Sequence, residues 1–160
     1  NTEDEAAALV ASAKYAPAGN RGLAVSHRAA RHGFGSAVAY TRKANDNTLV
    51  VCYIETREAV ERVEEISAVD GIDVLFAGPW DLSQSYGMPG QTDHPIVKEA
   101  LNRVVSACEK HNKVAGTIAG NVSEAQTRAQ QGFRFLAYSS DLGMLGQVAQ
   151  SVLSELRGSI

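Results

Sequence analysis

Residues 48–55 read TLVVCYIE, and this stretch decides the fold class of the chain. It holds no charge before Glu55 and is rich in β-branched and apolar side chains. An apolar run of this length predicts a strand, Thr48–Ile54, that is buried on both faces, as strands of a parallel sheet are. Arg57–Val69 follows with apolar residues at helical spacing. The chain therefore contains a strand–helix unit here.

Three further units follow at similar spacing. The expected strands are Val74–Ala77, Val114–Ile118 and Phe133–Tyr138, and the expected helices are Pro95–His111, Ser123–Gln131 and Leu142–Leu156. Alternation of strands and helices predicts an α/β fold with a parallel sheet. Four units can form an open doubly wound sheet or half of a (β/α)8 barrel. Neither GxGxxG nor GxxxxGK[ST] follows a strand, so the usual phosphate-binding loop of nucleotide-binding sheets is lacking.

The first part of the chain is less regular. Thr2–Tyr15 is predicted to be a helix with Thr2 as its cap. The glycine-rich stretch that follows has no clear period, and we expect a short strand at Leu23–Val25 and a helix around Ser36–Lys43. The chain opens at Asn1 without a methionine and already in a helical pattern. We therefore expect a cleaved, truncated or partly sequenced chain.

Composition narrows the class of protein. The 160 residues suffice for one domain, 1–160, and the net charge of −3, with no block of basic residues, argues against a nucleic-acid partner. No apolar run approaches the roughly 20 residues that span a bilayer, and the acidic first residues do not resemble a signal peptide. Cys52 and Cys108 lie in apolar stretches, which favours buried free thiols over a disulfide or a nucleophile. The cytoplasm is the expected location.

Two acids stand where parallel strands end. Glu55 follows the first strand, and Asp81 follows the next one along the chain, 26 residues later. Because reactive side chains of parallel α/β folds gather at the carboxyl ends of the strands, the two carboxylates are expected to face one another. Their oxygens suit Mg²⁺ or Mn²⁺, with coordination places left for water and a chelating α-keto acid. Such a metal would act as a Lewis acid.

A plainer interpretation is equally consistent with the pattern. Asp81 could cap a helical turn over Leu82–Tyr86, and Arg57 could neutralise Glu55. The turn between them adds a possible substrate contact, because glycine at position 78 permits close backbone approach and exposed amides can bind a carboxylate. Trp80 is expected either to form a wall of the substrate pocket or to pack on the next helix. The predicted substrate-binding residues are Gly78, Pro79, Trp80 and Asp81.

The remaining polar candidates are weaker. His27, His32, His94 and His111 are scattered, and none follows a strand, so surface or packing roles are favoured. Asp141 is predicted to cap the last helix, and Asn121 to form a turn before the cap Ser123. Arg21-Gly22 could bind an anion, although a structural ion pair is the favoured alternative.

The sequence resembles the metal-dependent pyruvate aldolases of the HpcH/HpaI aldolase/citrate lyase family, whose members include 4-hydroxy-2-oxoheptanedioate aldolase and macrophomate synthase. The matching motifs are Gly19-Asn20-Arg21-Gly22, Lys43-Ala44-Asn45-Asp46, Ile54-Glu55-Thr56-Arg57-Glu58-Ala59, Gly78-Pro79-Trp80-Asp81-Leu82-Ser83 and Asp93-His94-Pro95. The resemblance extends over nearly the whole chain. Many members have alanine where Trp80 stands, which implies a reshaped substrate pocket.

The resemblance implies the C-terminal half, strands 5–8, of a (β/α)8 TIM barrel. It also implies that Glu55 and Asp81 bind a divalent metal, Mg²⁺ first and Mn²⁺ or Co²⁺ as alternatives, while the turn amides around Gly78 and Trp80 hold the pyruvate carboxylate. The general base and the arginine of the family would lie in an N-terminal half-barrel that this chain does not contain, so no catalytic residue is assigned here. Family members form homo-oligomers, often by exchanging the last helix. Leu142–Leu156 could do this or pack on its own barrel.

The expected activity is that of a carbon–carbon lyase, a class II aldolase. It would form or cleave a bond to a metal-chelated pyruvate enolate, with an aldehyde as the second substrate and oxaloacetate decarboxylation as a variant. Two alternatives are a non-catalytic half-barrel that serves as a binding or assembly module, and a CoA-thioester lyase of the citrate or malyl-CoA type. The thioester lyase would need a basic CoA groove, of which the sequence gives no sign.

Overall fold

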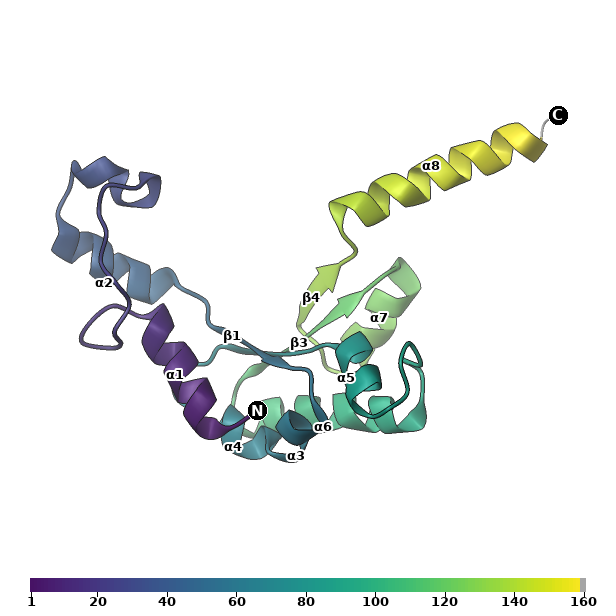
Figure 1. The fold of residues 1–160 in the computed structure, drawn as a ribbon, viewed down its shortest axis with the longest axis horizontal. Coiled ribbons are helices and arrows are strands. Elements are labelled where there is room, and N and C mark those ends of the chain that lie inside the picture. Colours follow the sequence, from purple (N-terminus) through teal and green to yellow (C-terminus); the bar gives the residue numbers. More distant parts are fainter. Residues whose placement is uncertain (159–160) are drawn as a thin grey trace.

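Four parallel strands form one sheet in the order β1-β2-β3-β4 (Figure 1). The computed structural model describes residues 1–158. The strands are β1 (Val51–Ile54), β2 (Val74–Ala77), β3 (Val114–Ala119) and β4 (Phe135–Tyr138). The helices are α1 (Glu3–Ala13), η1 (Arg28–Gly33), α2 (Ala37–Asn47), α3 (Arg57–Glu61), α4 (Val63–Ser67), α5 (Pro79–Ser85), α6 (Pro95–Lys110), α7 (Val122–Gln130) and α8 (Asp141–Gly158). The predicted alternation of strands and helices is confirmed.

Helices cover one face of this sheet. Leu75 and Ala77 of β2 point to α6, which packs on β2 and β3. Val97 and Val104 of α6 are fully buried, as is Ile54 at the end of β1. Each such side chain contributes about 1.5–3 kcal/mol by leaving water. Figure 1 shows α3, α4 and α6 together below the sheet. This packing fixes the carboxyl ends of β1 and β2 beside one another.

An aromatic row crosses the opposite face. Tyr53, Phe76, Gly116 and Phe135 are aligned by the strand register. The ring of Phe76 lies 5.1 Å from that of Tyr53 and 6.2 Å from that of Phe135, centroid to centroid. A Cβ atom on Gly116 would come within 2.9 Å of Phe76 Cδ2 and 3.2 Å of Phe135 Cδ1. Glycine is therefore needed at this position so that two rings can meet across β3.

The predicted burial of the first strand on both faces is wrong. Tyr53 is 59% exposed, because its face of β1 has no covering element among residues 1–158. The strand is also shorter than predicted, since it begins at Val51. Alternation of side chains about the pleat explains how Ile54 is buried while its neighbour Tyr53 is exposed.

Several helix boundaries also differ from the prediction. Arg57–Val69 is divided into α3 and α4, because Arg62 takes non-helical angles (φ −106°, ψ 15°). Residues 23–25 form no strand, and the predicted helix around Ser36–Lys43 is α2, which continues to Asn47.

Two caps are shifted by one or two residues. Asn121, and not Ser123, caps α7, since its Oδ1 accepts a hydrogen bond from the Glu124 amide. Asp141 is the first residue of α8, while the Ser140 hydroxyl accepts from the Gly143 amide. The cap predicted at Thr2 is confirmed as a full capping box with Glu5.

The last helix does not pack on the sheet of its own chain. Figure 1 shows α8 extending away beyond β4, and none of its residues is buried. Its apolar side chains, among them Leu145, Val148 and Leu156, remain about half exposed or more. Within residues 1–158, no helix combines the length and apolarity needed to cross a bilayer.

Candidate metal centre

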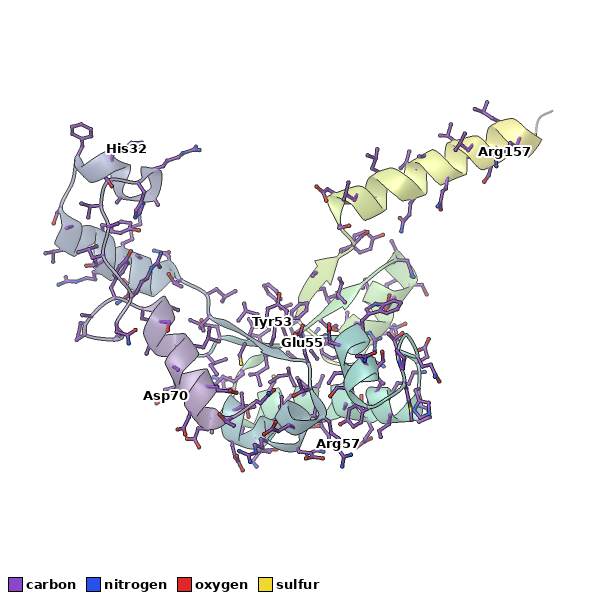
Figure 2. All side chains as sticks on the ribbon, viewed as in Figure 1. His32, Tyr53, Glu55, Arg57, Asp70 and Arg157 are labelled. Atoms are coloured by element: carbon purple, nitrogen blue, oxygen red, sulfur yellow. The ribbon has the colours of Figure 1, made fainter. Side chains whose placement is uncertain are left out.

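The two predicted carboxylates occupy neighbouring strand ends. Glu55 directly follows β1, and Asp81 is the third residue of α5, which begins just after β2. The Gly78 amide donates to the Ile54 carbonyl at 3.3 Å, which ties the two strand ends together. Figure 2 shows Glu55 at the end of β1, near Tyr53. The arrangement follows from the parallel register, in which Ile54 lies beside Ala77.

Both carboxylates converge on Gly78. A Cβ atom on Gly78 would lie 3.0 Å from Glu55 Cγ and Oε1 and 3.3 Å from Asp81 Oδ2. The distance between Glu55 Oε1 and Asp81 Oδ2 therefore cannot exceed the sum of their two distances from that Cβ position. Because the φ of Gly78 is −95°, which any residue adopts, glycine leaves space here for the two side chains and is not required for backbone freedom.

The helix-cap interpretation of these acids is wrong. Thr56, and not Glu55, caps α3 through its Oγ1, and Arg57 pairs with Glu61 at 2.7 Å. Asp81 lies inside α5, whose N-cap residue, Gly78, has no side chain to cap it. Within the described part of the chain, neither carboxylate forms an ion pair. Both remain available for a ligand.

The electrostatics of this site favour a cation. Burial, followed by the negative charge of Asp81, raises the pKa of the Glu55 carboxyl above its usual value. Two carboxylates held this close repel one another, and a divalent ion between them would relieve that repulsion.

The donor set fits a hard divalent cation of the Mg²⁺ type. No group of three or more His, Cys, Asp or Glu side chains suited to a metal occurs among residues 1–158, so this chain would supply two oxygen ligands. Mg²⁺ is commonly held by one or two carboxylates, with water and substrate oxygens completing its octahedron. Cys52, which is half-buried, and Cys108, which is buried, are both free thiols, and neither belongs to a group of three or more possible metal ligands among residues 1–158.

Trp80 lines a pocket, which is the second feature near the carboxyl ends of the strands. Its side chain is 63% exposed and lines a pocket of about 620 Å³ together with Lys98, Asn121 and Arg128. Trp80 therefore lines a pocket, but neither Glu55 nor Asp81 is among its lining residues, so the role of Trp80 as a wall of the substrate pocket stays a prediction. The lining residues come from α5, the segment before α6, α6, the end of β3, and α7 with its flanking residues.

Arg128 is a polar residue of this pocket that the sequence did not reveal. It is 5% exposed, contacts Glu124 and Gln131, and keeps its Nε without a partner. Nothing in the helical pattern of α7 distinguishes a buried arginine from an exposed one, because burial depends on how α7 packs on other elements, among them β3 and β4. No sequence signal could have found it.

Other polar residues of the sequence motifs make structural contacts. Asn45 bonds the backbone of Tyr15 in both directions, at 2.7 and 2.9 Å. Lys14 Nζ donates to the carbonyls of Asn45 and Thr48. His94 caps α6, since its Nδ1 accepts a hydrogen bond from the Ile96 amide, which is a structural role for this histidine. The contacts of Asn45 and Lys14 join the end of α1 to the end of α2 and so position β1.

We expect the metal-free stability of the Glu55→Gln variant to exceed that of the parent by a margin that grows from about pH 4 to about pH 7. A carboxyl whose pKa is raised on folding holds its proton more tightly in the folded state. Its favourable contribution is therefore present at low pH and lost as the pH rises through the folded pKa. Thermal denaturation with a chelator at each pH measures the margin. Glu58→Gln, which also replaces one carboxylate, at an exposed position of α3, is the matched control variant. A margin that shrinks toward neutral pH would contradict the prediction.

Comparison with known proteins identifies the fold family. A family model described as HpcH/HpaI aldolase/citrate lyase matches residues 1–147. The 5-keto-4-deoxy-D-glucarate aldolase of Shigella boydii serotype 18 is 35% identical over 151 residues, which are 94% of this chain and 58% of that protein. The chain thus spans less than two thirds of the length of this curated relative.

Solved structures agree with this match. An HpcH/HpaI aldolase/citrate lyase family protein from Burkholderia cenocepacia J2315 superposes with a TM-score of 0.90 at 34% identity, covering 98% of this chain and 62% of that one. The HpcH/HpaI aldolase from Desulfitobacterium hafniense DCB-2 superposes with a TM-score of 0.86 at 28% identity, covering 98% and 60%. The prediction of half a (β/α)8 barrel is confirmed, and the open doubly wound sheet is excluded. The chain belongs to the HpcH/HpaI aldolase/citrate lyase family.

Proposed function

We propose that this chain is the metal-binding half of a carbon–carbon lyase, a class II aldolase that acts on a pyruvate-like keto acid. The observation that carries the proposal is the convergence of Glu55 and Asp81 on Gly78, free of caps and ion pairs. The names of the relatives, which are aldolases, support it. A non-catalytic assembly module would have no need for two unpaired acids at one strand edge.

Each residue of the site has a proposed role. Glu55 and Asp81 would hold the divalent cation, with Mg²⁺ favoured and Mn²⁺ or Co²⁺ as alternatives. When bound, such a cation supplies Lewis-acid stabilisation of negative charge on a keto oxygen. Gly78 keeps the space open. Since its amide is already bonded to Ile54 and Pro79 has none, the substrate carboxylate would be held by the first-turn amides of α5, those of Trp80 and Asp81.

The other groups of the reaction would come from outside this chain. We propose that an N-terminal half-barrel supplies the base that moves the proton and covers the aromatic row of Tyr53, Phe76 and Phe135. We also propose a homo-oligomer in which a neighbouring subunit covers the apolar side chains of α8, and a cytoplasmic location in keeping with the free thiols of Cys52 and Cys108.

Metal removal tests this function. Oxaloacetate is a suitable probe, because its decarboxylation passes through the same pyruvate enolate and needs no knowledge of the aldehyde. We expect the native protein to release CO₂ and pyruvate from oxaloacetate, to lose this activity on dialysis against a chelator, and to regain it with Mg²⁺ or Mn²⁺. Activity that persists through complete metal removal would refute the proposal.

The wall formed by Trp80 should select the aldehyde. Trp80→Ala would enlarge the pocket that Trp80 lines together with Lys98, Asn121 and Arg128, so the KM values for aldehydes of different length should change by about tenfold relative to one another. The affinity for the divalent cation should stay unchanged, because the tryptophan side chain carries no ligand atom. Aldol kinetics with a series of aldehydes and one fixed pyruvate concentration measure the change. An unchanged order of aldehydes would contradict this role.

A further inference from the structure

The segment 14–48 differs from the rest of the chain in its charge. It contains six lysines and arginines and one acid, Asp46, whereas the whole chain has 15 basic and 18 acidic residues. This segment, here called the basic arm, includes η1 and α2 and projects from the sheet beside α1 (Figure 1). On a protein that is acidic as a whole, a locally basic surface attracts anions more strongly than the other surfaces do.

A cavity of about 550 Å³ lies within the basic arm. Arg21, Arg31 and Lys43 line it, together with Tyr40 and Ser36, and no acid is among its lining residues. Within residues 1–158, none of these three cations forms an ion pair. The structural ion pair favoured for Arg21 from the sequence is therefore wrong. Three positively charged side chains line one cavity that no acidic side chain lines.

Arg21 is held in place by two contacts. Its amide donates to the Lys14 carbonyl at 2.9 Å, and its guanidinium lies 4.8 Å above the centre of the Tyr15 ring. The Tyr15 ring in turn meets that of Tyr40 at 5.9 Å. A guanidinium fixed on an aromatic face keeps its N–H groups free for a carboxylate or a phosphate.

Arg31 and Lys43 come from two further elements. Arg31 and His32 both adopt the left-handed region, with φ values of 52° and 54°, and the Arg31 carbonyl accepts from the Phe34 amide at 3.0 Å. Figure 2 shows His32 at the far end of the arm. Consecutive left-handed residues with side chains are costly, and such positions cluster at functional sites. Lys43 lies one turn after Tyr40 on the same face of α2.

We propose that this cavity binds a small organic anion that carries two or more carboxylate or phosphate groups. The volume falls in the range of small-molecule sites and exceeds what one inorganic ion fills. The two arginines offer planar forks for bidentate contacts, and Lys43 adds a point charge. The cavity shares no residue with Glu55, Asp81 or the pocket beside Trp80, so the site is separate from the proposed reaction centre.

Calorimetric titration of the native protein in chelator-treated buffer tests the proposal. Tricarballylate and pyrophosphate serve as the carboxylate and phosphate probes. We expect at least one to bind saturably, one per chain, with an affinity that falls as salt is added. The double variant Arg31→Gln/Lys43→Gln should weaken binding at least about tenfold. The matched variant Arg28→Gln/Arg42→Gln removes the same charge from the same two helices outside the cavity, and should change binding by less than about twofold.

Three outcomes would overturn the proposed anion site. The first is that neither probe binds. The second is that both double variants weaken binding equally, which would show only a general attraction of anions to the basic arm. The third is that the variant in the cavity changes the mass of the assembly and leaves anion binding unchanged, which would make this face a protein interface. The probe that binds more tightly distinguishes a carboxylate ligand from a phosphate ligand. Glu55→Gln should retain anion binding, so a failure of the proposed lyase activity and a failure of this site are told apart.

Discussion

Glu55→Gln is expected to lower lyase activity on the order of 10³-fold while the fold is kept. The amide preserves the size of the side chain but removes the negative charge that would hold a divalent cation opposite Asp81. Because Glu55 caps no helix and forms no ion pair, its loss should remove no structural contact. Oxaloacetate decarboxylation at saturating Mg²⁺ measures the rate, and circular dichroism confirms the fold.

Matched variants make the result specific. Glu58→Gln removes the same charge from the exposed first turn of α3 and should leave the rate within about twofold of the parent. Asp81→Asn should repeat the loss seen for Glu55→Gln, since both acids would share one cation. Binding of Mn²⁺ followed by electron paramagnetic resonance should fall in both site variants. Full activity of Glu55→Gln would remove the metal centre from the proposed mechanism.

Gly78→Ala is expected to lower activity by about 10²-fold with little change in unfolding temperature. The added methyl group would lie 3.0 Å from Glu55 Oε1 and 3.3 Å from Asp81 Oδ2, closer than carbon and oxygen normally approach. The side chains would have to move apart, and a displacement of even a fraction of an ångström misplaces a metal ligand. The φ of −95° excludes backbone strain as the cause of any loss.

A second glycine provides the control for this substitution. A Cβ atom on Gly22 would meet no atom within 4 Å, so Gly22→Ala should leave both rate and stability unchanged. Parallel measurement of decarboxylation and of Mn²⁺ affinity separates a displaced cation from a blocked substrate. If Gly78→Ala keeps parental activity and cation affinity, the two carboxylates do not act together at this point.

The strand–helix order could be predicted because its signals are local. The pattern predicts β2 to the residue, since Val74–Ala77 is a short apolar run that Gly78-Pro79 ends. The division of Arg57–Val69 at Arg62 could not be predicted, because the apolar residues of α3 and α4 continue one face across the break. The exposure of Tyr53 was also missed, since an apolar side chain does not reveal which neighbour covers it.

Only part of the candidate site could be predicted from the sequence, because the rest depends on how the elements pack. Strand ends place Glu55 and Asp81 at one edge, but whether they cap helices depends on the residue at which each following helix begins. Thr56 as the cap of α3 and Pro79 as the first residue of α5 decided that question. Arg128, with its unpartnered Nε, was invisible because its burial depends on packing against other elements.

The sequence by itself determined the order of strands and helices, the family and the two acids that follow β1 and β2. Each of these depends on residues that are neighbours along the chain. Only the tertiary structure decided that these acids meet over Gly78, and that Arg21, Arg31 and Lys43 surround one cavity without an acid. Both depend on distances between residues far apart along the chain, which are set by strand register and helix packing.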